Sequence, residues 1–218
     1  QSPLVQILFL KTYLIKKEPK MPNWCWNTLD VSGPSEDIQK FKVTANGPVQ
    51  SYHDYRSMSG EWPIHDDVRL KALAESMPEP GEASVFSFHA LFPVPDEVRQ
   101  LPYDGKQAQE VAEMLGRTYA SSGYKWENDN WGCKWGCAEP ELLNEEDSYL
   151  GYSFETPWAP PISFLTKVAA DWPTLCFELH YEEAGMGFAG EAEFYDGELQ
   201  GDNCYDLPQD DGEEDCDE

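Results

Sequence analysis

Three short segments combine aromatic residues with polar side chains that could bind a ligand: NWGCKW at 130–135, FETPWAPP at 154–161 and YEEAGMGFAGE at 181–191. A tryptophan offers a large apolar surface with one hydrogen-bond donor, which suits either a core or a binding pocket. Three interpretations stay open: a buried polar–aromatic network that fixes the strands, a groove for a ligand or partner, and a catalytic site. The candidate binding residues are Asn130, Trp131, Lys134, Trp135, Glu155, Trp158, Glu182, Met186 and Glu191.

Sequence signatures of catalysis are missing. The sequence contains no G-x-S-x-G elbow, no H-E-x-x-H and no phosphate-binding G-x-x-x-x-G-K-[ST]. The segment GMGFAG at 185–190 has the glycine spacing of a dinucleotide-binding loop, but it lies between two expected strands. No helix would follow it to hold a pyrophosphate. The sequence therefore favours a protein that is not an enzyme, with no catalytic residue and no cofactor.

Cysteine and histidine spacings argue against a metal centre. The six cysteines include one C-x3-C pair, Cys133 and Cys137, and the four histidines are scattered. A structural zinc site needs a second pair of ligands at a suitable spacing, which this chain does not offer. Without a secretory signal or a membrane-spanning segment, we expect reduced thiols, no metal and a cytoplasmic location in a bacterial host cell.

The two ends of the chain differ from its middle. Residues 1–20 are apolar and lysine-bearing, and a new composition begins at Met21. We expect Met21 to be the natural start and residues 1–20 to be a non-native leader, the alternative being a weakly helical arm at a membrane surface. Residues 198–218 are dominated by carboxylates and contain no lysine or arginine, which predicts a disordered acidic tail.

Residues 21–197 predict one domain of alternating strands and helices. The expected strands are 24–32, 84–91, 134–139, 148–156, 175–181 and 188–195. The expected helices are 35–45, 66–77, 105–119 and 162–172, with Ser35 as a cap of the first and Pro161 in the first turn of the last. Without 134–139, the last strand and insertions at about 47–83 and 93–132, the order is β-α-β-β-α-β. This is the ferredoxin-like split βαβ sandwich, an α+β fold with an antiparallel sheet and helices on one face.

The motifs MPNWCWNTLDVSG at 21–33, NWGCKW, FETPWAPP and YEEAGMGFAGE occur in an order that resembles the YubB-type ferredoxin-like domain family. The resemblance covers residues from about 21 to 197. It implies the ferredoxin-like fold and a protein of a phage, pathogenicity island or conjugative plasmid. It implies no catalytic mechanism and no iron–sulfur cluster, because the cysteine spacings match no cluster site.

Net charge limits the partners. The formal charge is −26, from 41 acidic and 15 basic residues. Neither end explains it, because residues 21–195 carry a net −18. Such a chain repels phosphate groups, which excludes general binding to DNA or RNA backbone. We also expect no direct nucleic acid binding through the sheet, because that mode needs a basic surround.

Two functions remain. The first is a non-enzymatic acidic interaction protein that binds a basic host or phage partner, such as a nucleic-acid-binding protein, in the manner of a DNA mimic. The alternative is a small-molecule or peptide-binding module that uses a Trp-rich groove around 131–135 and 155–158. Composition and spacing leave the partner and the oligomeric state undetermined.

Overall fold

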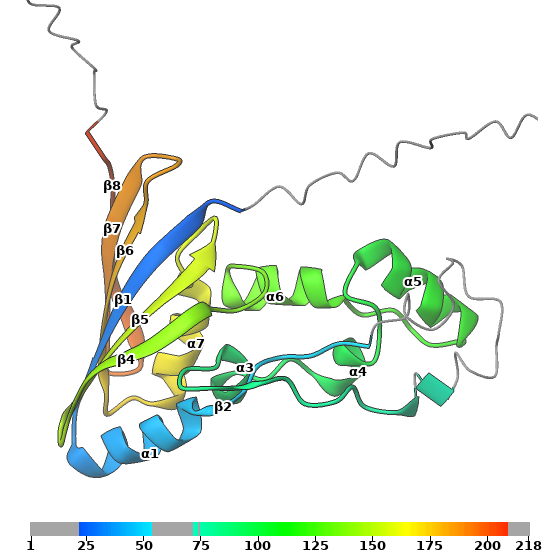
Figure 1. Cartoon of the computed structure of the whole chain (residues 1–218), viewed down its shortest axis with the longest axis horizontal. Helices are drawn as coiled ribbons and strands as arrows, with labels where there is room; N and C mark the ends of the chain where they lie inside the picture. The colour runs from blue at the N-terminus through cyan, green and yellow to red at the C-terminus, as the bar shows by residue number, and fades with distance from the viewer. Residues whose placement is uncertain (1–21, 54–71, 74, 209–218) are drawn as a thin grey trace, which may run out of the picture.

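The computed structural model describes residues 22–53, 72–73 and 75–208. The expected leader, most of the expected helix at 66–77 and residues 209–218 of the expected tail lie outside these ranges. The described residues form a sheet from which a long helical insertion extends, as Figure 1 shows.

Six strands form one antiparallel sheet in the order β4-β5-β1-β6-β7-β8. The strands are β1 (Trp24–Ser32), β4 (Ala138–Glu146), β5 (Tyr149–Pro157), β6 (Cys176–Glu183), β7 (Phe188–Tyr195) and β8 (Glu198–Asp206). β1 is central and alternates strictly, so that Cys25, Leu29 and Val31 are buried while Trp26 and Thr28 face the other way. This period of two is what a half-buried strand requires.

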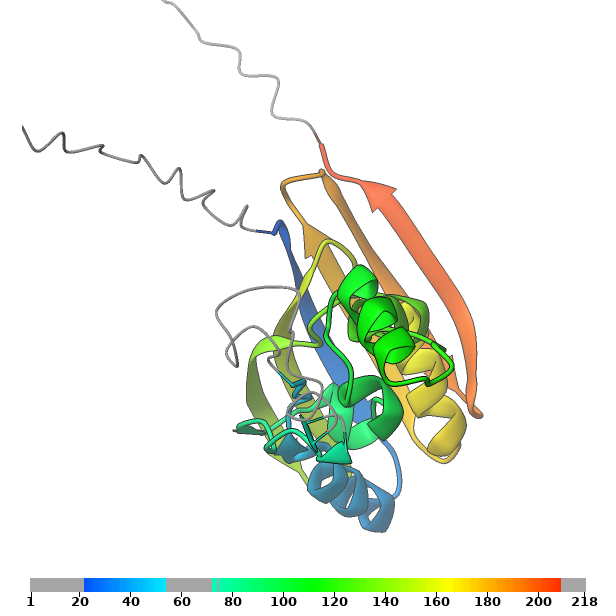
Figure 2. The same ribbon diagram turned by 90° about the vertical axis from the view of Figure 1, so that its right-hand side faces the viewer.

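The ferredoxin-like core is built from β1, α1 (Ser35–Ala45), β4, β5, α7 (Ile162–Asp171) and β6. The expected fold class, an antiparallel sheet with helices on one face, is confirmed (Figures 1 and 2). β7 and β8 extend the sheet beyond this core as a hairpin. Pro34 and Pro161 occupy the N-cap positions of α1 and α7, so the expected cap at Ser35 and the expected first-turn place of Pro161 are each displaced by one residue.

One face of the sheet carries the hydrophobic core. From α1, Ile38 and Phe41 pack on it, and α7 contributes Phe164 and Leu165. The rings of Phe164 and Phe88 stack with their centroids 3.8 Å apart. Burial of large aromatic side chains of this kind is worth about 2–3 kcal/mol each, which is why the helices stay on this face.

The second strand of the core is β4, and the strand expected at 84–91 is wrong. Only Ala83–Ser84 pair, as β3 with β2 (Gly47–Pro48), and Phe88–Leu91 form the short helix α3. Ser87 starts that helix, because its hydroxyl accepts a hydrogen bond from the Ala90 backbone N–H at 3.1 Å. The apolar residues at 86 and 88 are buried against the core, which is why their alternation resembled that of a strand.

A single insertion therefore joins α1 to β4, in place of the two that the sequence suggested. It contains β2, β3, α3, α4 (Asp96–Arg99), α5 (Gly105–Met114) and α6 (Gly123–Trp131). The expected helix at 105–119 ends five residues early, and α6 was not expected at all. A small separate hydrophobic cluster around α5, with Ala108, Val111 and Ala112, stabilises the far end of the insertion.

The expected boundary of the acidic tail is also wrong. Glu198–Asp206 form β8, which pairs with β7 along its whole length. All nine residues of β8 are exposed, so the sequence has no alternation of apolar and polar residues that would predict this strand. Its acidic side chains suit an edge strand, since charge discourages pairing with another chain.

Candidate functional site

The face of the sheet opposite the helices is open, and no described residue covers it in Figure 1. The register determines which side chains meet there. In the central strand, Trp26 lies opposite Glu182 of β6 and Asp30 lies opposite Glu178. On the other side of β1, Trp26 lies opposite Glu155 of β5.

Carboxylates dominate this open face, which we call the acidic face. Its members come from five strands and alternate with the buried residues: Asp30, Glu141, Glu146, Glu155, Glu178, Glu182, Glu191 and Glu193. The six strands contain no lysine and no arginine. Among the described residues no ion pair involves any member of the acidic face. Its negative charge is therefore uncompensated by neighbouring side chains.

The side of the sheet that faces the helices differs from the acidic face in its ion pairs. Glu145 of β4 points toward the helices, and its carboxylate lies 2.6 Å from the ammonium of Lys42 in α1. On α1 itself, Lys40 pairs with Glu36 at 2.8 Å. Some carboxylates on the helix side are thus paired with lysines, whereas among the described residues those of the acidic face are not.

Trp26 is the exposed aromatic at the centre of the acidic face. Its side chain is 66% exposed, although it lies in the middle strand of the sheet. It borders a shallow hollow of ≈ 330 Å³ together with Thr28, His180, Glu182 and Tyr205. A large exposed aromatic surrounded by polar groups is typical of a residue that anchors a binding partner. The sequence analysis placed Trp26 in a strand and did not identify it as a site residue.

Three metal-ligand types converge in the same area. One ligand atom from each of Asp30, Glu178 and His180 lies within 4.8 Å of the others. The hydroxyl of Tyr149 donates a hydrogen bond to Asp30 and so orients it. Carboxylate and imidazole are ligands that Zn²⁺ accepts, but exposed acidic groups also gather without an ion. The sequence spacings, which place these residues on two strands, gave no indication of this cluster.

The candidate residues from the sequence separate into three places. Glu155, Glu182 and Glu191 lie on the acidic face. Met186 is 65% exposed in the turn between β6 and β7. The remaining candidates lie on α6, at the loop that follows it and beyond the end of β5.

Two of these candidates serve the fold. Trp131 is fully buried, and its indole N–H donates to the backbone oxygen of Phe92 at 3.1 Å. Asn130 donates to the backbone oxygen of Trp126, four residues earlier in the same helix. A binding role for Trp131 is therefore wrong, because no partner can reach it.

Lys134, Trp135 and Trp158 do come together. The ammonium nitrogen of Lys134 lies 3.9 Å from the centre of the Trp135 ring and 5.9 Å from that of Trp158. Trp135 is 46% exposed and Trp158 is 40% exposed. We call this pair of indoles the tryptophan clamp.

A buried carboxylate lies beneath the clamp. Glu127 of α6 is fully buried and accepts hydrogen bonds from the Tyr52 hydroxyl, the Tyr103 hydroxyl and the Trp135 backbone N–H, each at 2.7 Å. Burial raises the pKa of Glu127, and these hydrogen bonds oppose that shift. The sequence analysis did not identify Glu127 as a site residue, because nothing in the pattern marks this glutamate as buried.

Two of the thiols among the described residues are not activated as nucleophiles. Burial raises the pKa of Cys25 and of Cys137 to about 12. Since the thiolate is the reactive form, these cysteines are inert at neutral pH.

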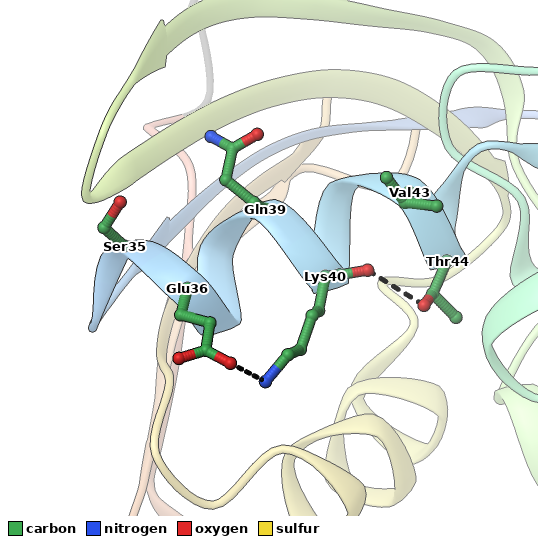
Figure 3. Close-up of a pocket in the computed structure, with 6 residues that line it drawn as sticks. All are labelled: Ser35, Glu36, Gln39, Lys40, Val43 and Thr44. Carbon is green, nitrogen blue, oxygen red and sulfur yellow. Dashed lines mark hydrogen bonds and ion pairs between the residues drawn. The ribbon is translucent and has the colours of Figure 1, made fainter.

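A surface hollow of ≈ 840 Å³ lies along the exposed side of α1 (Figure 3). All of its lining residues come from this one helix: Ser35, Glu36, Gln39, Lys40, Val43 and Thr44. A hollow without a second wall cannot enclose a ligand, and its polar groups are partly engaged with each other through the Glu36–Lys40 ion pair. We assign it no function.

Part of the chain is similar to a known protein family. Residues 139–218 match the family described as the ferredoxin-like domain in Api92-like protein. The match begins at β4 and includes β5, α7, β6, β7 and β8, so the added hairpin lies within the Api92-like domain.

Two known proteins are also similar to this chain. The uncharacterized protein YubB of Escherichia coli (strain K12) is 30% identical over 79 residues, which span 36% of this chain and 54% of YubB. The chain thus matches about half the length of that curated relative. The crystal structure of protein api92 from Yersinia pseudotuberculosis superposes with a TM-score of 0.57 at 11% identity, covering 86% of this chain and 99% of api92. The resemblance to the YubB-type family is confirmed, and the api92 likeness extends to the fold alone.

No helix among the described residues is long and apolar enough to cross a membrane.

Proposed function

We propose that this Api92-like protein binds a positively charged protein through the acidic face of its sheet. The observation that carries the proposal is the unpaired set of carboxylates on one open face, on strands that have no lysine or arginine. Evenly spread charge would serve solubility alone, whereas a contiguous field of one sign attracts a partner of the opposite sign. The fitting occupant is the arginine- and lysine-rich surface with which a nucleic-acid-binding protein holds phosphates.

Trp26 gives this surface a centre. Charged groups steer a partner and select it, but a buried aromatic anchor contributes more to the strength of a complex. Trp26 can lose its remaining exposure on binding, while Glu155 and Glu182 on either side of it pair with basic side chains. The same topology binds RNA when its open sheet is basic, and here the opposite charge favours a protein partner.

The alternative, a small-molecule or peptide-binding module with a Trp-rich groove, is weakened by the burial of Trp131. Its remaining exposed tryptophans are Trp135 and Trp158. They lie at the end of the sheet and line none of the hollows described above.

The test is binding of a fluorescein-labelled peptide of alternating arginine and glycine, followed by fluorescence anisotropy on the full chain. The triple variant Glu178→Gln, Glu182→Gln and Glu191→Gln removes three exposed carboxylates from the acidic face. We expect its affinity for the peptide to fall by about 10-fold to 100-fold at low salt. Salt should weaken wild-type binding steeply and binding by the variant much less.

The matched control is Glu36→Gln, Glu97→Gln and Glu113→Gln, which removes the same charge from exposed positions on α1, α4 and α5. It should bind within about 3-fold of wild type, because none of these sites lies on the acidic face. Equal losses in both triple variants would show that only net charge matters, and the proposal would be abandoned.

A further variant tests the anchor. Trp26→Ala should reduce peptide affinity by about 10-fold or more, in the range of an interface hot spot. Its free energy of unfolding should change by less than about 1 kcal/mol, because the exposed part of the indole makes no core contacts. Unchanged affinity would place the binding surface elsewhere.

A further inference from the structure

The tryptophan clamp is assembled from segments far apart in the sequence. Trp135 follows α6, and Trp158 follows β5. Both side chains are large, apolar and substantially exposed, which is an unfavourable state unless something covers them. In this structure the ammonium group of Lys134 lies over the two rings.

The backbone holds both indoles in a strained but fixed arrangement. Trp135 has a φ of 68° and Trp158 a φ of 75°, in the left-handed region that a bulky residue rarely adopts. Such a conformation costs about 1–3 kcal/mol and persists only when its surroundings impose it. Here the Trp135 N–H donates to buried Glu127 at 2.7 Å, and the Trp158 N–H donates to the Asn23 backbone oxygen at 2.9 Å.

Lys134 indicates what the clamp accepts. Most other lysines among the described residues pair with carboxylates, as Lys42 and Lys125 do, although no ion pair of Lys167 is found there. Within the described residues Lys134 makes no ion pair, and its ammonium lies on the face of Trp135 instead. The negative face of an indole attracts a cation with about 0.5–1 kcal/mol at an exposed site.

The surroundings also favour a cation. Ala138, which begins β4 just after the Lys134 loop, lies opposite Glu155 in the register, and Glu155 in turn lies opposite Trp26. The start of β4, which follows Trp135 closely in the sequence, therefore lies beside the acidic face. An anionic ligand approaching it would meet the same negative field that repels phosphate.

We propose that Trp135 and Trp158 bind a cationic side chain, an arginine above all, of the basic protein partner. This inference rests on the proposed function and adds a specific contact to it. Lys134 is the internal occupant, which covers the indoles in the free protein and is displaced when the partner binds. The planar guanidinium of arginine stacks on indole better than an ammonium does, which gives the site a preference for arginine over lysine.

The test uses two lysine variants that change net charge equally. Lys134→Met removes the internal occupant, and Lys167→Met removes an exposed lysine of α7. Both should bind the alternating arginine–glycine peptide more tightly than wild type, because each removes one repelling charge. We expect Lys134→Met to exceed Lys167→Met by about 2-fold to 5-fold, which corresponds to the energy of one exposed cation–π contact.

Removing an indole should abolish that extra gain. In the Lys134→Met background, Trp135→Leu or Trp158→Leu should return affinity to that of Lys167→Met, and preference for the arginine peptide over a lysine peptide should decrease. Circular dichroism and the thermal midpoint check that each variant folds. Each tryptophan is substituted in a separate variant. The comparison of Lys134→Met with Lys167→Met does not depend on either tryptophan variant.

The clamp is overturned if Lys134→Met and Lys167→Met bind alike, or if the extra gain survives the loss of either indole. These outcomes differ from failure of the proposed function. If the proposed function fails, the acidic-face triple variant binds the peptide like its control. The difference in affinity between the two lysine variants still tests the clamp.

Discussion

At the scale of single residues, His89 of the insertion makes the stability of the fold depend on pH. Its Nδ1 accepts a hydrogen bond from the Val94 backbone N–H at 3.0 Å. Burial, and then the charge of Arg99, lower the pKa of His89 to about 4. A histidine in an unfolded chain titrates near about 6.5. The folded protein therefore takes up this proton less readily than the unfolded chain does.

We predict that the free energy of unfolding decreases as the pH falls from about 6.5 to about 4, because only the unfolded chain binds the proton in this interval. The stabilisation is complete above that interval and lost within it. Partial exposure of His89 limits the effect to about 1–2 kcal/mol. Urea denaturation across this pH range measures it.

His89→Asn supplies the comparison, because an amide oxygen can accept the same hydrogen bond without titrating. Its stability should vary less with pH than that of wild type. Identical slopes for wild type and His89→Asn would contradict the assignment.

At the scale of elements, the β6–β7–β8 meander depends on a glycine. A Cβ at Gly190 of β7 would lie 2.4 Å from the ring of Tyr181 on β6 and 2.7 Å from the Asn203 backbone oxygen on β8. The missing side chain lets the Tyr181 ring cross β7, so that its hydroxyl donates to Asp202 at 2.8 Å. The tyrosine thus joins three strands.

We predict that Gly190→Ala lowers the free energy of unfolding by about 2–4 kcal/mol, because backbone on one side and a buried ring on the other leave no room for a methyl group. Gly201→Ala on the neighbouring strand is the matched control. A Cβ at Gly201 meets nothing within 4 Å, so this change should stay within about 0.5 kcal/mol. Urea denaturation measures the free energy of unfolding of both variants. Equal losses would show that the crossing of Tyr181 over β7 is not the cause of the destabilisation by Gly190→Ala.

Elements with a regular apolar period could be predicted from the sequence. β1, β5, β6, β7, α1 and α7 all have one, and their expected positions agree with the structure to within a few residues. β8 has no apolar face to show, and α6 places the carboxylate of Glu127 where a helix normally has an apolar residue. Phe86 and Phe88 are buried by a turn and a short helix and still alternate like a strand.

The candidate site was only partly predictable for a related reason. Glu155, Glu182 and Glu191 were identified from motifs, but their common face depends on the strand order. The sequence analysis placed the second strand of the core at 84–91 instead of at β4. The reason is that β4 has an apolar residue at Leu142 but little regular alternation. Trp131 and Trp135 lie in one motif, and only the helix end between them places the first in the core and the second at the surface.

At the scale of the whole molecule, charge is segregated across the sheet. Lysines of the helical side pair with carboxylates, as in Lys42–Glu145 and Lys125–Asp129. The strands of the open side have carboxylates but no lysine or arginine, and the mutual repulsion of these carboxylates disfavours the compact state. A protein that keeps such a surface accepts lower stability in the absence of a partner.

We predict that salt stabilises this protein. Raising NaCl from about 0.05 M to about 0.5 M shortens the screening length to below the size of the acidic face, and the thermal midpoint should rise by about 2–6 °C. The triple variant at Glu178, Glu182 and Glu191 should start with a higher midpoint and gain less from salt. The control triple variant should respond to salt as wild type does, because it leaves the acidic face intact. If both variants gained equally from salt, the repulsion would not be concentrated on the acidic face, and the electrostatic argument for a basic partner there would lose its basis.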